Sequence, residues 1–287
     1  MKIYQRKEGR YIDDAQFKEG ALRFLYQSAP GRIVLNYLTL PLCSRIAALY
    51  YRHPLSRKKI TGFIREYAIE MGEYEEKRYC SFDDFFTRKL KKGARKICAD
   101  KKRLISPADA KLLVYPITPA CRLKIKGMEY SLEELLLSKA LAEKFQGGSA
   151  LLFRLGAQDY HRYAFVEEGE IIARRKIKGR LHSVSPYSLA YPVLAQNSRE
   201  YMLIRSRKLG IFIQMEIGAL LVGGIANHFA ERARRGREKG FFHFGASAIL
   251  VLVQKGRLKI DKDIERESAS GIETVVKYGE GIGEMIC

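Results

Sequence analysis

The chain has 287 residues, of which 47% are hydrophobic and 11% aromatic, so it can bury a substantial core and does not have the composition of a disordered protein. Its 52 Lys and Arg residues outnumber its 32 Asp and Glu residues, which gives a formal net charge of +20. This excess favours a polyanionic partner, either a nucleic acid or an anionic membrane surface. Neither a zinc-finger spacing nor the Lys/Arg-Gly-aromatic signature of RNA-binding domains occurs, so we expect no nucleic-acid partner.

The cysteines and the first residues argue against secretion. The five cysteines are scattered, odd in number and without a CxxC pair, which is typical of a reducing cytoplasm and not of a disulfide framework or a zinc site. Basic residues near the N-terminus precede acidic and polar residues instead of the apolar stretch of a secretory signal. We therefore expect no leader peptide.

The first third of the chain is predicted to be helical. Residues 20–26 and 31–51 begin it, with Pro30 as a break and Pro41 as a kink or second break. Residues 56–69 place apolar side chains at the spacing of one helical face. Ser81 has the chemistry of an N-cap for a short helix that follows it.

Two segments of this region have open interpretations. The apolar stretch from Ile33 to Tyr51 is interrupted by polar residues and Pro41, so we do not expect it to span a membrane. It suits a helix that lies either on a bilayer or on the protein core. The basic run from Arg88 to Arg103 is either a solvated surface or a contact with anionic lipid headgroups.

From Leu104 onward the segments become short, rich in β-branched and aromatic residues, and separated by Gly and Pro, which is typical of strands. One helix, from Ser131 to Phe145, interrupts them and begins with a capping-box pattern. The fold class is therefore α+β, with a helical N-terminal portion (1–103) packed on a β-rich, barrel- or sandwich-like core (104–287). The predicted strands cover residues 111–117, 150–155, 170–177, 202–205, 211–217, 220–225 and 248–253.

Three residues are candidates for chemistry, although each alone has an ordinary explanation. Asp109 lies in the turn Ser-Pro-Ala-Asp, where an Asp is usually structural. His161 lies between aromatic residues in Asp-Tyr-His-Arg-Tyr, and Ser247 precedes a buried-looking strand. No GxSxG, Walker A or GxGxxG motif surrounds any of them, so the sequence gives no support for a hydrolase or nucleotide-binding function.

Seven short segments, taken in chain order, resemble the phosphatidylserine decarboxylases over nearly the whole chain. Seven such segments in the same order as in that family form a far more specific signal than any single motif. The segments that carry the resemblance are 82–90, 93–95, 106–109, 159–163, 197–200, 217–223 and 236–247.

The resemblance implies a proenzyme that cuts itself between Ala246 and Ser247. It implies a β chain ending at 246 and an α chain of 247–287 whose first residue becomes a pyruvoyl group. That ketone would condense with the amine of phosphatidylserine and accept electrons as carbon dioxide leaves, giving phosphatidylethanolamine. Asp109 matches the orienting carboxylate of the cleavage relay, and His161 matches the residue connected with decarboxylation. The resemblance also implies a phospholipid substrate and pairing into homodimers. Because the chain is basic and that substrate lies in an anionic surface, we expect peripheral attachment to the cytoplasmic face of the cell membrane through the N-terminal helices and the basic run, without a membrane span.

The chain departs from the family pattern at the relay. Ala164 stands where the family has a second His, which is assigned to self-cleavage, and an alanine can neither take a proton nor bond to Asp109. Gly-Ala-Ser-Ala at 245–248 also differs from the usual cleavage motif. Three outcomes stay open: His161, His182 or His243 serves as the base, cleavage is slow but sufficient, or the chain is an unprocessed, inactive lipid-binding relative.

Overall fold

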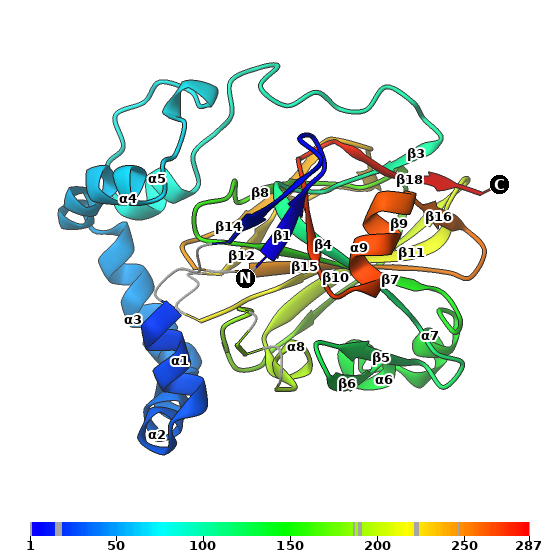
Figure 1. Cartoon of the computed structure of the whole chain (residues 1–287), viewed down its shortest axis with the longest axis horizontal. Coiled ribbons are helices and arrows are strands. Elements are labelled where there is room, and N and C mark those ends of the chain that lie inside the picture. The colour runs from blue at the N-terminus through cyan, green and yellow to red at the C-terminus, as the bar shows by residue number, and fades with distance from the viewer. Residues whose placement is uncertain are drawn as a thin grey trace.

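The helices of the protein gather at one end of a β-rich body. In this computed structural model, residues 2–14, 19–185, 187–188, 191–220, 224–245 and 247–286 are described. Helices α1 to α5 lie on the left in Figure 1, and the C-terminus lies at the opposite end of the sheets. The arrangement is α+β with sandwich-like layers, as the sequence predicts, and the large sheet is open instead of closing into a barrel.

The N-terminal helices begin and end close to the predicted positions. Ser28 caps α2 by accepting a hydrogen bond from the backbone N–H of Gly31 at 3.0 Å, and Pro30 lies in its first turn, where proline is tolerated. Pro41 begins α3, so the predicted break is confirmed. Ser81 caps α5 through the N–H of Asp84 at 3.2 Å. The elements are α1 (Glu19–Gln27), α2 (Ala29–Leu38), α3 (Pro41–Arg52), a 3₁₀ helix (Pro54–Lys59), α4 (Ile60–Glu66), a second 3₁₀ turn (Met71–Glu73) and α5 (Phe82–Phe86).

Ten of the described strands form one large sheet. Its neighbouring strands are antiparallel except for β1 and β17, which are parallel. In spatial order the strands are β13 (Arg232–Ala233), β9 (Gly169–Ile177), β10 (Arg199–Ser206), β11 (Gly210–Ile217), β15 (Ser247–Val253), β7 (Ser149–Leu155), β4 (Ala110–Pro116), β17 (Glu273–Val276), β1 (Lys2–Gln5) and β2 (Arg10–Asp13).

Smaller elements cover the two faces of this sheet. The lower face in Figure 1 carries a hairpin and short helices, and the upper face carries two three-stranded sheets and α9. The remaining elements are β5 (Arg122–Ile125), β6 (Met128–Ser131), α6 (Leu132–Leu136), α7 (Lys139–Glu143), α8 (Val193–Gln196), β12 (Ile225–Asn227), β14 (Glu238–Phe242), β8 (Arg162–Ala164), β16 (Leu258–Ile260), β18 (Gly281–Met285), β3 (Arg103–Ile105) and α9 (Lys262–Ala269).

Strand β15 is buried on both faces because each face of the sheet supports a separate core. Alternate side chains point to opposite faces of a strand. Ala248, Leu250 and Leu252 pack into one core together with α6 and α7. Ile249, Val251 and Val253 pack into the other, beneath β8 and β14. Ser247 shares the parity of the second set, so its side chain faces the layer that contains β8 and β14.

The structure corrects three expectations from the sequence. Residues 131–145 form two short helices instead of one, because Leu137 adopts a left-handed conformation (φ 50°) and Ser138 caps a new helix. The helical first third also contains β1 and β2, which extend the large sheet. Of the strand predicted at 220–225, residues 221–223 lie outside the described part of the chain, and β12 begins only at Ile225.

Candidate active site

Ser247 is the first residue of β15 and is completely buried. It pairs with Leu155 of β7 in the antiparallel register. Its Oγ has no hydrogen-bond partner among the residues that the structure describes. A buried hydroxyl without a partner typically costs about 1–3 kcal/mol. A serine hydroxyl reacts as a nucleophile when a base within reach takes its proton, so the neighbouring acceptors decide what Ser247 can do.

His161 lies immediately before β8 and is also completely buried. Its Nδ1 is 2.9 Å from the backbone oxygen of Asp159, which can only accept, so Nδ1 carries the proton and Nε2 keeps its lone pair. Nε2 has no hydrogen-bond partner within the described ranges. Burial and the positive charges of Arg88 and Lys111 lower the pKa of His161 to about 3. The imidazole is therefore neutral at pH 7, and the lone pair of Nε2 is available as a hydrogen-bond acceptor.

An aromatic cluster joins His161 to the segment that precedes Ser247. The ring of Phe86, on α5, lies 3.9 Å from the ring of His161 and 5.1 Å from the ring of Phe244 between centroids. The backbone N–H of Phe242 donates to the backbone oxygen of His161 at 2.9 Å. The histidine and the chain leading to Ser247 are therefore held against the same helix.

Asp83 of α5 fixes this segment directly, a role that no sequence pattern assigned to it. Its Oδ1 accepts the backbone N–H of Phe244 at 3.0 Å, and its Oδ2 lies 2.8 Å from Nδ1 of His243. Burial alone would raise the pKa of Asp83, but the contacts with His243 and Phe244 outweigh it and lower the pKa. Asp83 lies within the segment 82–90 that carries the family resemblance, which was the available signal.

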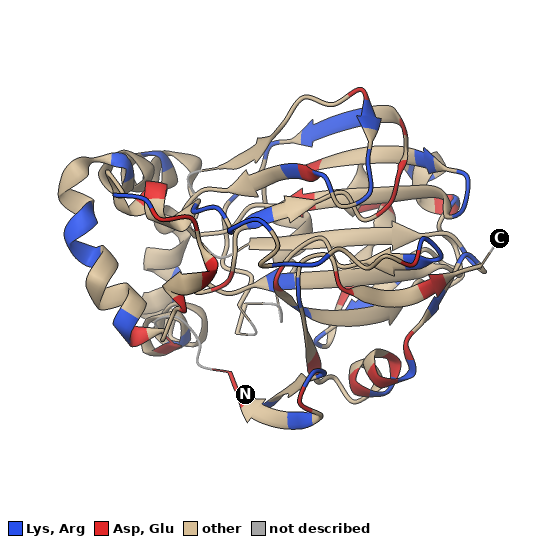
Figure 2. Cartoon of the chain, turned by 90° about the horizontal axis from the view of Figure 1, so that it is seen from above, with Lys and Arg blue, Asp and Glu red and all other residues tan. Residues whose placement is uncertain are grey.

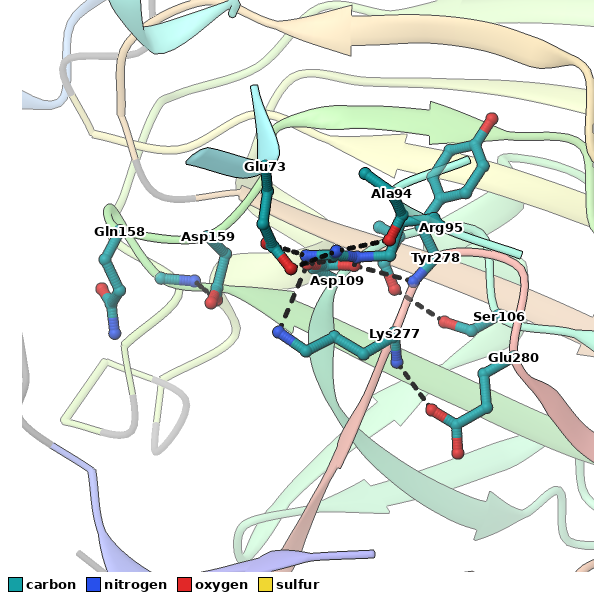
Figure 3. Close-up of polar contacts among 12 residues, drawn as sticks. Glu73, Ala94, Arg95, Ser106, Asp109, Gln158, Asp159, Lys277, Tyr278 and Glu280 are labelled. Carbon is teal, nitrogen blue, oxygen red and sulfur yellow. Dashed lines mark hydrogen bonds and ion pairs between the residues drawn. The ribbon is translucent and has the colours of Figure 1, made fainter. Parts of the chain in front are cut away.

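Asp109 is buried and is held by two cationic side chains and a backbone N–H. Figure 3 shows its carboxylate facing the guanidinium of Arg95, which donates from Nη2 at 2.7 Å and from Nε at 3.0 Å. The backbone N–H of Tyr278 donates at 2.8 Å, and Lys277 Nζ lies 3.4 Å away. Burial acts to raise the pKa of Asp109, but Arg95 and Lys277 outweigh it and lower the pKa, so the carboxylate is ionised.

Asp109 immediately precedes β4, and Ser247 begins β15, which lies two strands away in the large sheet. Lys111 pairs with Arg154 across β4 and β7, and Arg154 pairs with Ala248 across β7 and β15, so these three residues form one row. Two strand steps amount to roughly 10 Å. In the part of the chain that the structure describes, no hydrogen bond joins Asp109 to His161 or Ser247. Their joint action in a relay stays a prediction.

The other candidate bases lie at the edges of this site. His243 is held by Asp83, and its backbone N–H donates to the oxygen of Gly224 at 3.1 Å. His182 lies beside Tyr26 of α1, and burial lowers its pKa to about 4. Ala164 is completely buried, and its backbone N–H donates to the oxygen of Pro107 at 2.8 Å. Position 164 thus adjoins the turn that leads to Asp109.

Comparisons with known proteins all point to one family. The family model for phosphatidylserine decarboxylase matches residues 82–284. The phosphatidylserine decarboxylase proenzyme 2 of Clostridium acetobutylicum is 45% identical over 284 residues, with 98% of both chains covered. The phosphatidylserine decarboxylase proenzymes of Ruminiclostridium cellulolyticum and Fusobacterium nucleatum are 39% and 36% identical and cover 100% and 99% of this chain. The chain, with its buried Ser247 and His161, belongs to the phosphatidylserine decarboxylase family.

Proposed function

We propose that this chain decarboxylates phosphatidylserine to phosphatidylethanolamine with a pyruvoyl group made from its own Ser247. Family membership supports the reaction and the substrate. The observation that carries the self-processing step is the pair of unbonded buried atoms, Ser247 Oγ and His161 Nε2, on elements joined by the Phe86 cluster. One is a hydroxyl that can act as a nucleophile and the other a lone pair that can accept its proton, and no hydrogen bond joins the two in the described part of the chain.

The self-cleavage uses atoms that the chain already contains. Ser247 Oγ attacks the carbonyl carbon of residue 246, His161 Nε2 takes the hydroxyl proton, and the peptide C–N bond breaks as an ester forms. Loss of a Cα proton of residue 247 and breakage of its Cβ–O bond release residue 246 as a carboxylate and leave dehydroalanine. Water then replaces the imine nitrogen, which departs as ammonia, and a ketone remains at residue 247.

Residues around position 247 fit such a ketone. A pyruvoyl group supplies an electron-withdrawing carbonyl for the loss of carbon dioxide. His161 could receive a proton at Nε2 and pass it on there, because its Nδ1 proton is held by the oxygen of Asp159 and its Nε2 lone pair has no other partner among the described residues. The apolar walls formed by Phe86 and Phe244 keep water from competing for that proton.

We infer a peripheral attachment to the cytoplasmic face of the cell membrane. Among the described helices, none is by itself long and apolar enough to cross a bilayer; α2 and α3 meet that test only as a pair bent by 72°. On α3, Leu42, Ile46 and Leu49 are 63%, 60% and 70% exposed, which argues against its interpretation as a core helix. Lys and Arg residues accompany these helices (Figure 2), as expected for a helix at an anionic surface.

The membrane-facing role of α3 has a direct test. Replacing Leu42 and Ile46 by Ser should weaken sedimentation with phosphatidylserine vesicles. Since basic residues add a screened attraction, raising the salt concentration should weaken the parent protein's binding as well. Vesicle binding that depends on neither change would contradict this orientation. Pairing into a homodimer stays an expectation from the resemblance.

The alternative, an unprocessed lipid-binding relative, rests on Ala164. The neutral His161 offers a base without a second imidazole, and the relatives carry proenzyme names, so we favour the enzyme. Intact-mass analysis of natively expressed protein should show two chains, one of them beginning with a ketone that reacts with hydroxylamine. The Ser247→Ala variant should stay a single chain without activity on phosphatidylserine. A parent protein that remains continuous through residue 247 would refute the proposal.

A further inference from the structure

A pocket of about 560 Å³ lies between α3 and the β9–β10 side of the large sheet. It is lined by residues of α3, of β9 and β10, and of the segments next to residues 221–223. We propose that it receives the headgroup of phosphatidylserine, with Arg45 and Lys178 binding the phosphate. This inference deepens the proposed function and rests on it.

The pocket reaches the neighbourhood of Ser247 through its glycines. Ile217 pairs with Ala248, so the next residue, Gly218, lies level with Ser247 on the adjacent strand. Gly218 lines the pocket, and so does Gly224, whose oxygen accepts the backbone N–H of His243 at 3.1 Å. The pocket wall therefore flanks both the strand that begins at Ser247 and the segment that precedes it.

Gly218 also has little room for a side chain. A Cβ at this position would lie 3.1 Å from Leu181 Cδ2 and 3.3 Å from the oxygen of Ser198. Bare backbone therefore forms the part of the wall beside Ser247. The close packing of Leu181 and Ser198 against Gly218 fixes this part of the wall beside the start of β15.

A second connection runs through Arg52, at the end of α3. Its Nε lies 3.6 Å from Oδ2 of Asp83, the carboxylate that holds His243 and Phe244. Arg52 lines the pocket as well. Helix α3, which carries the exposed apolar side chains, is therefore connected through Asp83 to the segment that precedes Ser247.

The charges in the pocket match the headgroup. Phosphoserine in a lipid carries a phosphate, a carboxylate and an ammonium group. Glu200 supplies a carboxylate, already 2.5 Å from Lys176 Nζ, while Arg199 is occupied by backbone oxygens of Leu135 and Ala195. Arg45 and Lys178 are exposed and form no ion pair with any residue of the described ranges. They remain available for a phosphate, which binds strongly through charge-assisted hydrogen bonds.

The apolar part of the lining gives the rest of the lipid a path. Ala48 and Leu49 of α3 face Ile177, Leu181 and Ile225 across the pocket. Leu49 is 70% exposed and continues into the apolar surface of α3 formed with Leu42 and Ile46. The glycerol and acyl chains can therefore leave the pocket along α3 toward the bilayer while the headgroup stays near position 247.

The test uses self-processed enzyme and dihexanoyl-phosphatidylserine below its micelle concentration, so that no membrane surface contributes. Arg45→Gln and Lys178→Gln should each raise KM about tenfold or more and leave kcat within about twofold, because each removes a charged hydrogen-bond donor from the phosphate. Arg32→Gln on α2 is the matched control: it removes the same charge outside the pocket and should leave KM unchanged. All variants should still self-cleave, because that step needs no lipid.

The outcomes separate the two proposals. Parent protein that self-cleaves and decarboxylates the soluble lipid, with KM unchanged in Arg45→Gln and Lys178→Gln, would overturn the headgroup site and leave the proposed function intact. The headgroup site would also be overturned if Arg45→Gln and Lys178→Gln lose activity only on vesicles and by no more than Arg32→Gln does. In that case the charges act through the membrane surface. Parent protein without activity on phosphatidylserine would overturn both.

Discussion

Asp83 provides the sharpest test of how the precursor is prepared for self-cleavage. In the Asp83→Ala variant the buried N–H of Phe244 loses its acceptor and His243 loses its partner. A buried donor left without a partner costs about 1–3 kcal/mol, and a hydrogen bond to a charged group contributes about 1.5–3 kcal/mol. Because the carboxylate is largely buried, we expect the free energy of unfolding to fall by about 2–4 kcal/mol.

The effect on self-cleavage should be larger than the effect on folding. Asp83 holds the backbone three residues before Ser247, and a displacement of about 1 Å in an attacking geometry can cost about 100-fold in rate. The matched variant Asp83→Asn keeps an oxygen for the N–H of Phe244 but loses the charge that faces His243 and Arg52. It should therefore cut itself faster than Asp83→Ala and more slowly than the parent.

The assay follows freshly translated precursor in a cell-free system and quenches samples in detergent for gel and intact-mass analysis. Circular dichroism and thermal unfolding of the purified variants establish that they are folded. A folded Asp83→Ala protein with a lowered Tm that cuts itself at the parental rate would refute the argument that this contact prepares the bond for attack.

Three further changes have defined outcomes. Ala164→His places an imidazole in a completely buried position, so the free energy of unfolding measured by urea titration should fall by about 1–3 kcal/mol through overpacking. If position 164 can join the relay, this variant should also cut itself faster than the parent. An unaltered free energy of unfolding would contradict the packing. Lys239→Met leaves the buried carboxylate of Glu216 unpaired and should cost about 3–5 kcal/mol, most of which Lys239→Met combined with Glu216→Leu should recover. The pKa of Asp109 is lower in the folded than in the unfolded state, so its stabilising effect is complete above pH ~4 and is lost as the pH falls through the folded pKa. Asp109→Asn should therefore flatten the pH dependence of the free energy of unfolding, measured by urea titrations between pH 7 and pH 3. A variant whose free energy of unfolding falls as steeply as that of the parent would count against this argument.

Local patterns predicted the elements whose determinants are close in sequence. Ser81 and Pro41 mark helix starts through contacts within one turn, and both were predicted. The single helix at 131–145 was wrong because α6 and α7 bury their apolar residues in the same core, so the apolar stripe continues across the break. The sequence offers no Gly at Leu137 to indicate the left-handed turn.

Non-local pairings limited the rest of the prediction. Strand β1 pairs with β17, some 270 positions along the chain, and its own composition gives no hint of that partner. The same holds for the candidate site: motifs proposed His161 and Ser247, whereas the contact of Asp83 with a segment 160 residues away has no local signal. The resemblance identified Asp109, but its actual partner, Arg95, follows from the path of the chain between α5 and β3.

The unbonded hydroxyl of Ser247 is best understood as a feature of the precursor. A neighbouring acceptor would stabilise the folded precursor by satisfying the hydroxyl proton, but the same hydrogen bond would have to break before His161 could take that proton. The proposed conversion of residue 247 to a ketone would remove the hydroxyl and with it the unsatisfied donor. The cost of burying it is therefore confined to the interval before the proposed cleavage. Since Ala164 stands beside the 106–109 turn and offers no imidazole there, the proposed mechanism assigns the proton of Ser247 to His161.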